Sequence, residues 1–250
     1  MFRPITILTS LMLSGSVMAF STTDLFPNEQ VVVGVSAGPT WLFGNKNQTI
    51  NLQPDVVKTY TGGNDTNVFP TGEIFLGLQK PFNASSLNQS FVGQLGISFA
   101  GAGYGRVNGN IWDDGDPAFN NSDYTYKVNH MLLAIKGRLI ADCNYFFKPY
   151  VSASLGVGFN RAYDFSINTK INQEVAAPPF SSNTNTTFSY TLGVGLQTTI
   201  TPHLQAAIGY EFADWGKTQL GRAQGQTVGN GLSLNHLYAN QLQLSLFYID

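Results

Sequence analysis

The sequence predicts an all-β protein, an eight-stranded antiparallel up-and-down transmembrane β-barrel with short periplasmic turns and four long extracellular loops. Three observations predict this fold class. Two alternating runs of apolar and polar residues meet at a turn within residues 187–215. Charged residues are only 11% of the 250 residues, against about 25% in an average soluble domain. Short and long connections also alternate along the chain.

The stretch 187–215, TFSYTLGVGLQTTITPHLQAAIGYEFADW, supplies two strands. Bulky apolar residues share one parity from Phe188 to Ile200, and again from Leu204 to Phe212. Because successive strand side chains point to opposite faces, each run has one apolar and one polar face. The turn at 201–203 contains a proline, which cannot donate to a β-ladder. Each run covers more than the roughly 9 to 11 residues that a tilted strand needs to cross a bilayer.

The same alternation, followed along the chain, predicts eight strands. They are the two of this hairpin and residues 31–43, 70–80, 90–104, 124–140, 149–163 and 236–249. Short turns are expected at 81–89, 142–148 and 201–203, and long loops at 44–69, 106–122, 164–186 and 216–235. Outer-membrane barrels place short turns in the periplasm and long loops outside. The even strand number is then expected to leave both termini in the periplasm.

Composition argues against other classes of protein. Mean hydropathy is −0.03, and beyond the N-terminus no apolar run approaches the roughly 20 residues of a membrane helix. With a net charge of −2 and no basic block, nucleic acid is not an expected partner. The one cysteine, Cys143, cannot form an internal disulfide.

Residues 1–19 have the pattern of an export signal, and residues 20–250 are expected to form the barrel domain. Arg3 gives a positive start, Ile5 to Val17 are mostly apolar, and Val17-Met18-Ala19 fits a cleavage site. The alternative is a membrane anchor helix, but the stretch is short and lacks a stop-transfer flank.

The polar parity of the expected strands carries the candidate site, a polar network in a narrow lumen. Its charged residues are Glu73, Glu211, Lys136 and Arg138, two of each sign. An unpaired charge in a confined lumen is costly, so Lys136 and Arg138 are expected to bond to at least one glutamate. His130 is expected to form a hydrogen bond in the lumen. Four glutamines are expected to complete the network: Gln94, Gln197, Gln241 and Gln243. Because eight strands leave room for little more than side chains, the network would plug the lumen.

With these features the sequence resembles the eight-stranded outer-membrane β-barrel superfamily, which includes the OmpA transmembrane domain and the opacity-type surface proteins. The resemblance spans the whole mature chain and rests on strand count, loop alternation, the segment GYEFADWGK at 209–217 and the alternating last strand. The chain departs from the family in ending Tyr248-Ile249-Asp250, where members usually end in an aromatic residue.

The resemblance implies a monomer in the outer membrane of a Gram-negative bacterium, exported through the periplasm and inserted by the barrel insertion machinery. Its partners would be outer-membrane lipid, lipopolysaccharide, and a host or surface ligand bound by the long loops. It implies a non-enzymatic surface protein of structural or adhesion type, at most a very narrow pore, with no cofactor.

Two other functions are considered. Some eight-stranded barrels resemble enzymes that modify the acyl chains of lipid A. Ser233 and His236 lie close in sequence, with Asp214 or Glu211 on the adjacent strand. Nucleophilic catalysis needs nucleophile, base and orienting group within hydrogen-bond reach. The other alternative is a soluble lipocalin-like barrel, in which the apolar parity faces inward.

The remaining motifs are expected to be ordinary loop features. The run Asp113, Asp114, Gly115 and Asp116 lacks the twelfth-position glutamate of an EF-hand and is expected to be a solvated acidic loop. Three Asn-x-Ser/Thr matches are attributed to Asn- and Thr-rich loops: Asn47, Asn64 and Asn185. The sequence has no dinucleotide fingerprint, phosphate-binding loop or metal-ligand cluster, so no catalytic, cofactor or metal residue is assigned.

Overall fold

The structure is a computed structural model that describes residues 29–43, 47–63, 67–84, 89–143, 145–171 and 178–250. The expected export signal at 1–19 lies outside the described residues. The strands are β1 (Gln30–Phe43), β2 (Gln48–Gln53), β3 (Val56–Gly62), β4 (Val68–Ala84), β5 (Gln89–Ala102), β6 (Gly105–Asp113), β7 (Asn120–Asp142), β8 (Lys148–Thr169), β9 (Asn183–Thr201), β10 (Leu204–Asp214), β11 (Thr218–Gln219), β12 (Ser233–Leu234) and β13 (Tyr238–Ile249). A short 3₁₀ helix, Pro117–Phe119, precedes β7.

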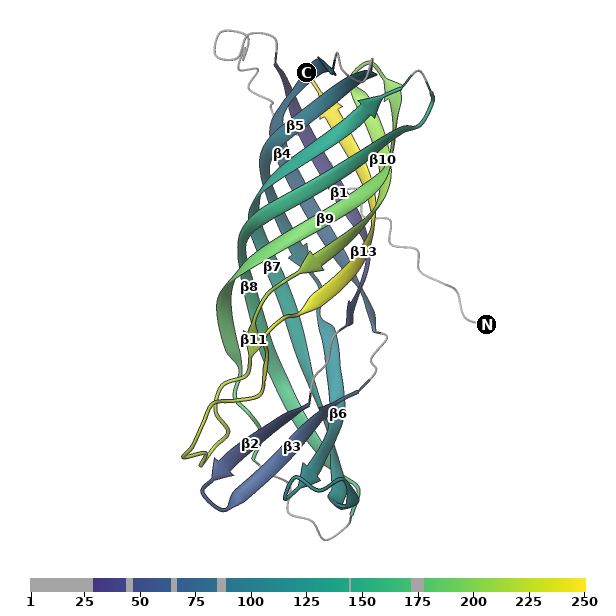
Figure 1. The fold of residues 1–250 in the computed structure, drawn as a ribbon. Coiled ribbons are helices and arrows are strands. Elements are labelled where there is room, and N and C mark those ends of the chain that lie inside the picture. Colours follow the sequence, from purple (N-terminus) through teal and green to yellow (C-terminus); the bar gives the residue numbers. More distant parts are fainter. Residues whose placement is uncertain (1–28, 44–46, 64–66, 85–88, 144, 172–177) are drawn as a thin grey trace, which may run out of the picture.

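Eight of these strands close into a barrel (Figure 1). Their order around the ring is β7, β5, β4, β1, β13, β10, β9 and β8, and β8 pairs back to β7. Every pair in the ring is antiparallel. The first strand begins and the last strand ends at one rim, where the Asp250 N–H donates to the Val31 carbonyl. The expected fold class and strand number are confirmed.

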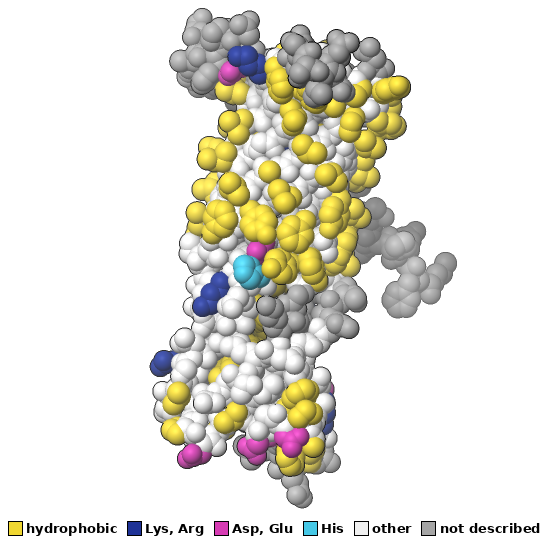
Figure 2. Space-filling model, viewed as in Figure 1, with side chains coloured by type: hydrophobic (Ala, Val, Ile, Leu, Met, Phe, Trp, Pro, Cys, Tyr) yellow, Lys and Arg dark blue, Asp and Glu magenta, His cyan; other side chains and the backbone are white. Residues whose placement is uncertain are grey.

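The outer surface of the barrel is an apolar belt (Figure 2). Many bulky residues of one parity are exposed, such as Leu95 (64%), Ile135 (65%) and Leu244 (66%). Toward the loops the belt on the β1–β13–β10–β9 wall ends in contacting rings of Phe43, Tyr238, Phe212 and Tyr190. Apolar exteriors flanked by aromatic residues are typical of barrels that face lipid. The soluble lipocalin-like alternative is wrong, because the apolar parity faces outward.

None of the helices in the described part of the chain is long and apolar enough to span a membrane.

Two of the expected long loops are largely strands, which corrects the sequence analysis. Residues 44–69 contain the β2–β3 hairpin, and residues 106–122 contain most of β6. β3 pairs with β6, and β6 pairs with the outer part of β7, so the sheet continues beyond the barrel. Here the apolar parity points inward, as shown by Ile50, Leu52 and Tyr60, all at most 5% exposed.

The last two expected loops are also more ordered than the sequence analysis predicted. β8 continues to Thr169, and β9 begins at Asn183. Residues 216–235 fold back across the end of the barrel, where β11 pairs with β12 and the Thr227 N–H donates to the Leu52 carbonyl. Buried Gln226 holds this segment by accepting from the Ala223 N–H and donating to the carbonyls of Val228 and Asn230.

We call this outer unit the extracellular half; it comprises β2, β3, β6, residues 120–129 of β7, residues 161–169 of β8, residues 178–182 and residues 215–237. The rest of the ring is the membrane half. The extracellular half has its own hydrophobic core, which reaches the first residues of β4 and the last of β10. Its largest members are Tyr60, Phe69, Ile111, Tyr124, Tyr126, Phe165, Phe180, Trp215, Leu220, Leu232 and Leu237. Tyr60, Tyr124, Phe165 and Phe180 pack with ring centroids 5.0–6.4 Å apart.

The acidic run at the end of β6 is tied into this unit. Asp113 forms an ion pair with Lys58 and accepts from the Asn121 amide, while the Asp116 carboxylate caps the 3₁₀ helix by accepting from the Ala118 N–H. Asp114 and Gly115 turn the chain with φ of 51° and 73°. The prediction of a solvated loop is therefore wrong for Asp113.

Two of the three Asn-x-Ser/Thr asparagines accept hydrogen bonds from nearby residues. The Asn47 side chain accepts from the Gly62 N–H, and that of Asn185 accepts from the Asn183 amide. Asn64 lies outside the described residues.

Candidate functional site

Lys136 lies at the centre of a charged cluster inside the membrane half. Its ammonium group donates to both carboxylate oxygens of Glu73, at 2.8 and 2.9 Å, and to Glu211 Oε2 at 2.8 Å. All three side chains are buried. Lys136 comes from β7, Glu73 from β4 and Glu211 from β10, and none of these strands are neighbours in the ring. The cluster therefore crosses the lumen and joins separate walls.

Two glutamines of β13 extend this cluster. Gln243 Nε2 donates to Glu211 Oε1 at 3.2 Å and to Gln241 Oε1 at 3.3 Å. Gly193 lies beside the cluster, where a Cβ would come within 2.4 Å of Ser152 Oγ. The parity of the strands thus brings two of the expected glutamines to the expected charges.

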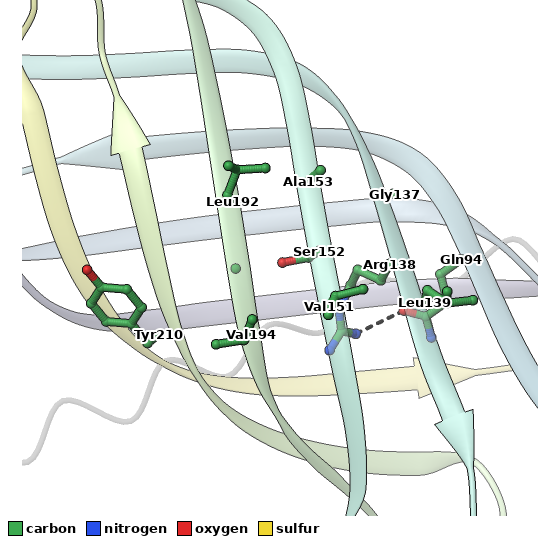
Figure 3. A pocket seen from close by; sticks show the side chains of 11 residues that line it. Gln94, Gly137, Arg138, Leu139, Val151, Ser152, Ala153, Leu192, Val194 and Tyr210 are labelled. Atoms are coloured by element: carbon green, nitrogen blue, oxygen red, sulfur yellow. Dashed lines mark hydrogen bonds between the residues drawn. The ribbon is translucent and has the colours of Figure 1, made fainter.

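Arg138 lies elsewhere in the lumen, which corrects the expectation that it would bond to a glutamate. Its guanidinium group is stacked between the rings of Tyr150 and Phe247, 4.2 and 4.1 Å from their centroids. It donates to Gln94 Oε1 at 2.9 Å, as Figure 3 shows. Inward residues two apart on a strand are roughly 7 Å apart. Arg138 therefore lies one layer nearer the periplasmic end than Lys136, where aromatic rings replace carboxylates.

The other expected residues form separate contacts. Gln94 Nε2 donates to Gln79 at 3.0 Å, and Gln197 donates to Gln205 at 2.5 Å near the short turn. His130 lies at the outer end of the lumen. Its Nδ1 is 2.6 Å from Asn160 Oδ1, and its ring stacks on Trp215 at 4.4 Å.

Trp215 was missed as an interior residue. It is 1% exposed and closes the lumen above the charged cluster together with His130. The signal was present, because Glu211 and Ala213 share the inward parity of β10, and Trp215, which follows the last residue of the strand, continues it. Between the cluster and the His130–Trp215 pair the cavity is about 10 Å³. Such a space holds about one water molecule.

A wider depression of about 640 Å³ lies over β7, β8 and β9 (Figure 3). Most of its lining is apolar and of the lipid-facing parity, including Leu139, Val151, Leu192 and Val194. Lipid tails are the natural filling of such a surface, so it is not a candidate site for a polar substrate.

The residues considered for catalysis are only partly brought together. His236 Nδ1 lies 2.8 Å from Asp214 Oδ2, and the other oxygen of Asp214 accepts from the Gly216 N–H. The Ser233 N–H donates to Gln48, and no hydrogen bond within the described residues joins Ser233 to His236. Glu211 is held in the lumen by Lys136, so it cannot orient His236. A base and an orienting group are present, but Ser233 is not placed as their nucleophile.

The described residues contain no group of three histidine, cysteine, aspartate or glutamate side chains that could hold a metal ion.

No protein-family model and no curated protein matches the sequence. Solved structures with a similar fold include Neisserial surface protein A, which is 11% identical with a TM-score of 0.39 over 88% of this chain and 96% of that chain. Ail, the attachment invasion locus protein of Yersinia pestis, is 14% identical with a TM-score of 0.35 over 89% and 97%. The outer membrane protease OmpT of Escherichia coli is 9% identical with a TM-score of 0.45 over 90% and 98%.

The fold itself rests on the geometry of this chain. A closed ring of eight antiparallel strands, an apolar exterior and a polar lumen occur together. The protein therefore has the fold of the eight-stranded outer-membrane β-barrel superfamily.

Proposed function

We propose that the protein is a non-enzymatic surface barrel of the bacterial outer membrane, which transports no solute through its lumen and acts through its extracellular half. The observation that carries this proposal is the filling of the barrel interior. Lys136 and two glutamates cross the lumen, His130 and Trp215 close it above, and the core of the extracellular half continues the packing outward.

The extracellular half supports a structural or adhesive role. Its packed core holds the β2–β3 hairpin and residues 216–235 in fixed positions. Fixed loops lose less conformational entropy on binding than free ones, which favours recognition of a surface ligand. Export by residues 1–19, insertion by the barrel machinery and a monomeric state are parts of the same proposal.

Conductance in planar lipid bilayers tests the closed lumen. The wild-type protein should give no steps beyond those of small ions. The triple variant Glu73→Ser, Lys136→Ser, Glu211→Ser removes the cluster without leaving a charge unpaired, and it should increase conductance if it folds. Large, stable single-channel currents from the wild-type protein would contradict the proposal.

The His236–Asp214 pair favours one other function, modification of lipid A. Mass spectrometry of lipid A from cells with and without the protein separates the two functions. Our proposal predicts identical acyl chains. A change in acyl chain number that requires the protein and is lost in His236→Ala would establish an enzyme instead.

A further inference from the structure

His130 is buried where the two halves of the molecule meet, and only one of its ring nitrogens has a partner. Nδ1 lies 2.6 Å from Asn160 Oδ1, and the ring stacks on Trp215 at a centroid distance of 4.4 Å. His130 is 3% exposed, and its Nε2 has no hydrogen-bond partner among the described residues. Because a buried polar atom without a hydrogen bond is costly, this nitrogen points to a ligand.

The position of the His130 ring is fixed by its surroundings. A Cβ on Gly158 would lie 2.8 Å from His130 Cε1, so a side chain at that position would displace the ring. The Trp215 carbonyl accepts from Asn160 Nδ2 at 2.7 Å and from Ser189 Oγ at 3.0 Å. Trp215 therefore cannot leave the ring without the loss of two buried hydrogen bonds, and Nε2 keeps one direction.

Asn160 determines which nitrogen of His130 carries the hydrogen. The amide nitrogen of Asn160 donates to the carbonyls of Trp215 and Lys217, at 2.7 and 2.9 Å. The amide oxygen therefore faces His130, and because it can only accept, Nδ1 is the donor. In a neutral imidazole the other nitrogen is then an acceptor. The partner that Nε2 requires is a hydrogen-bond donor.

A cavity of about 10 Å³ lies beside the ring, and five strands contribute polar groups to its lining. Since Nδ1 is turned to Asn160 on the neighbouring strand, Nε2 is the ring nitrogen left to face this cavity. A space of this size holds one water molecule, which needs roughly two to four polar partners. The polar side chains of the lining are those of Thr71, Glu73, His130, Thr191, Glu211 and Gln241.

The charges around the cavity also favour a donor. Glu73 and Glu211 contribute two negative charges and Lys136 one positive charge, so the cluster has a net charge of −1 (−2 + 1). Arg138 does not line the cavity. Carboxylate oxygens only accept, as His130 Nε2 does in this tautomer. A molecule between them must therefore donate in both directions, and water is small enough to do so.

We propose that this cavity is the binding site of one water molecule, which donates to His130 Nε2 and to a carboxylate of Glu73 or Glu211. The water joins the ion cluster to the His130–Trp215 pair that closes the lumen. Trp215 is the first residue of the segment 215–237, and its N–H donates to the Leu237 carbonyl at the end of that segment. The water therefore connects the two halves through the interior. This inference rests on the proposed closed lumen, because an open lumen would expose Nε2 to bulk water.

Solid-state NMR of the wild-type protein with ¹⁵N-labelled histidine, in lipid bilayers at neutral pH, tests for this water. Single substitution of each histidine in turn assigns the ring signals of the three histidines. The His130 ring should show a protonated Nδ1 and an unprotonated Nε2 that accepts a hydrogen bond. Magnetisation from a slowly exchanging water should reach Nε2. A protonated Nε2, or an Nε2 that no water magnetisation reaches, would overturn the proposal.

Double-mutant cycles measure the connection between the ring and the carboxylates. His130→Phe retains a ring that can stack on Trp215 and removes the acceptor, while Glu73→Gln and Glu211→Gln each remove one carboxylate. Urea unfolding in lipid vesicles gives the equilibrium constant of every single and double variant. In the background that lacks the carboxylate bound to the water, His130→Phe should change this constant by a factor about tenfold smaller than in the wild type, which is the size of a hydrogen bond to a charged group.

A matched control uses His203, whose Nδ1 lies 2.9 Å from the Ile249 carbonyl oxygen at the periplasmic rim. His203→Phe and either glutamate variant should have additive effects on the unfolding equilibrium, because these sites share no partner. Additive effects of His130→Phe with both glutamate variants would overturn the proposal.

Conductance in planar bilayers separates this inference from the closed lumen. If no water magnetisation reaches His130 Nε2 while the wild-type protein stays closed, this inference alone fails. Large wild-type currents would contradict the closed lumen itself, and with it the water site.

Discussion

The two halves of the molecule place opposite chemistry on the two faces of one continuous sheet. In the membrane half, β7 points Lys136 and Arg138 inward and Ile135 outward. In the extracellular half, the same strand points Tyr126 inward and Thr125 outward. The ladder between β7 and β8 runs through both halves, with one irregularity between Thr125 and Lys127. The inversion falls at Asn129 and His130.

The difference shows that the medium outside the wall decides which parity is apolar. Lipid takes up apolar side chains, so the barrel interior is left with polar groups that must satisfy one another. Water surrounds the extracellular half, so its apolar side chains turn inward and form a core. Because strand side chains alternate strictly, the backbone need not change at the boundary.

The largest expected effect is at the ion cluster of the membrane half. Lys136→Met leaves Glu73 and Glu211 buried without their cation, which should lower the free energy of unfolding by about 3–5 kcal/mol. Urea unfolding of the protein in lipid vesicles measures this loss. Adding Glu73→Gln and Glu211→Gln to the same variant should recover most of it. A loss below about 1 kcal/mol in Lys136→Met would mean that the interior is not sealed from water.

A pair of substitutions on the outer face of β7 compares the halves directly. Ile135→Arg places a charge in lipid near the middle of the belt and should cost about 2–4 kcal/mol. Thr125→Arg introduces an arginine on the same parity in the extracellular half, and the free energy of unfolding should stay within about 0.5 kcal/mol of the wild-type value. Both are measured by urea unfolding in vesicles. Equal costs at the two positions would contradict the inversion.

A smaller effect distinguishes two tyrosines of the extracellular core. Burial raises the pKa of Tyr60, so its hydroxyl stays neutral, and it has no hydrogen-bond partner among the described residues. Tyr60→Phe should therefore leave stability unchanged or slightly higher. The Tyr124 hydroxyl donates to the Thr61 carbonyl at 3.2 Å, and Tyr124→Phe should cost about 0.5–1.5 kcal/mol. Thermal unfolding of both variants measures the difference, and a larger loss for Tyr60→Phe would argue against this core.

The membrane half was predictable because lipid imposes a strong alternation. Each of Glu73, Lys136 and Glu211 lies on a strand whose alternate residues are bulky and apolar, and this alternation predicts that the charged side chain points inward. Their meeting depends on how far the strands are staggered around the ring, which no short-range pattern encodes. The stacking of Arg138 between Tyr150 and Phe247 also depends on this stagger, because the two rings come from β8 and β13.

The extracellular half was not predictable by the same rule. In β2, QTINLQ, the apolar residues are only Ile50 and Leu52, and they point inward. Asparagine and threonine on the other parity gave the segment the composition of a loop. An alternation of opposite sense, polar outward and apolar inward, was the signal that could have identified it.

The most direct test of the inversion is a spin-label accessibility scan along the outward parity of β7. Single cysteines at Asn121, Thr125, Asn129, Leu133 and Leu139 are labelled in a Cys143→Ser background, with the protein folded in lipid vesicles. The rate at which the spin label collides with lipid-soluble oxygen should be high at positions 133 and 139. Collision with a water-soluble nickel chelate should be high at 121 and 125, with the crossover at 129. Oxygen accessibility at 121 and 125 equal to that at 133 would contradict the account, because lipid would then surround both halves.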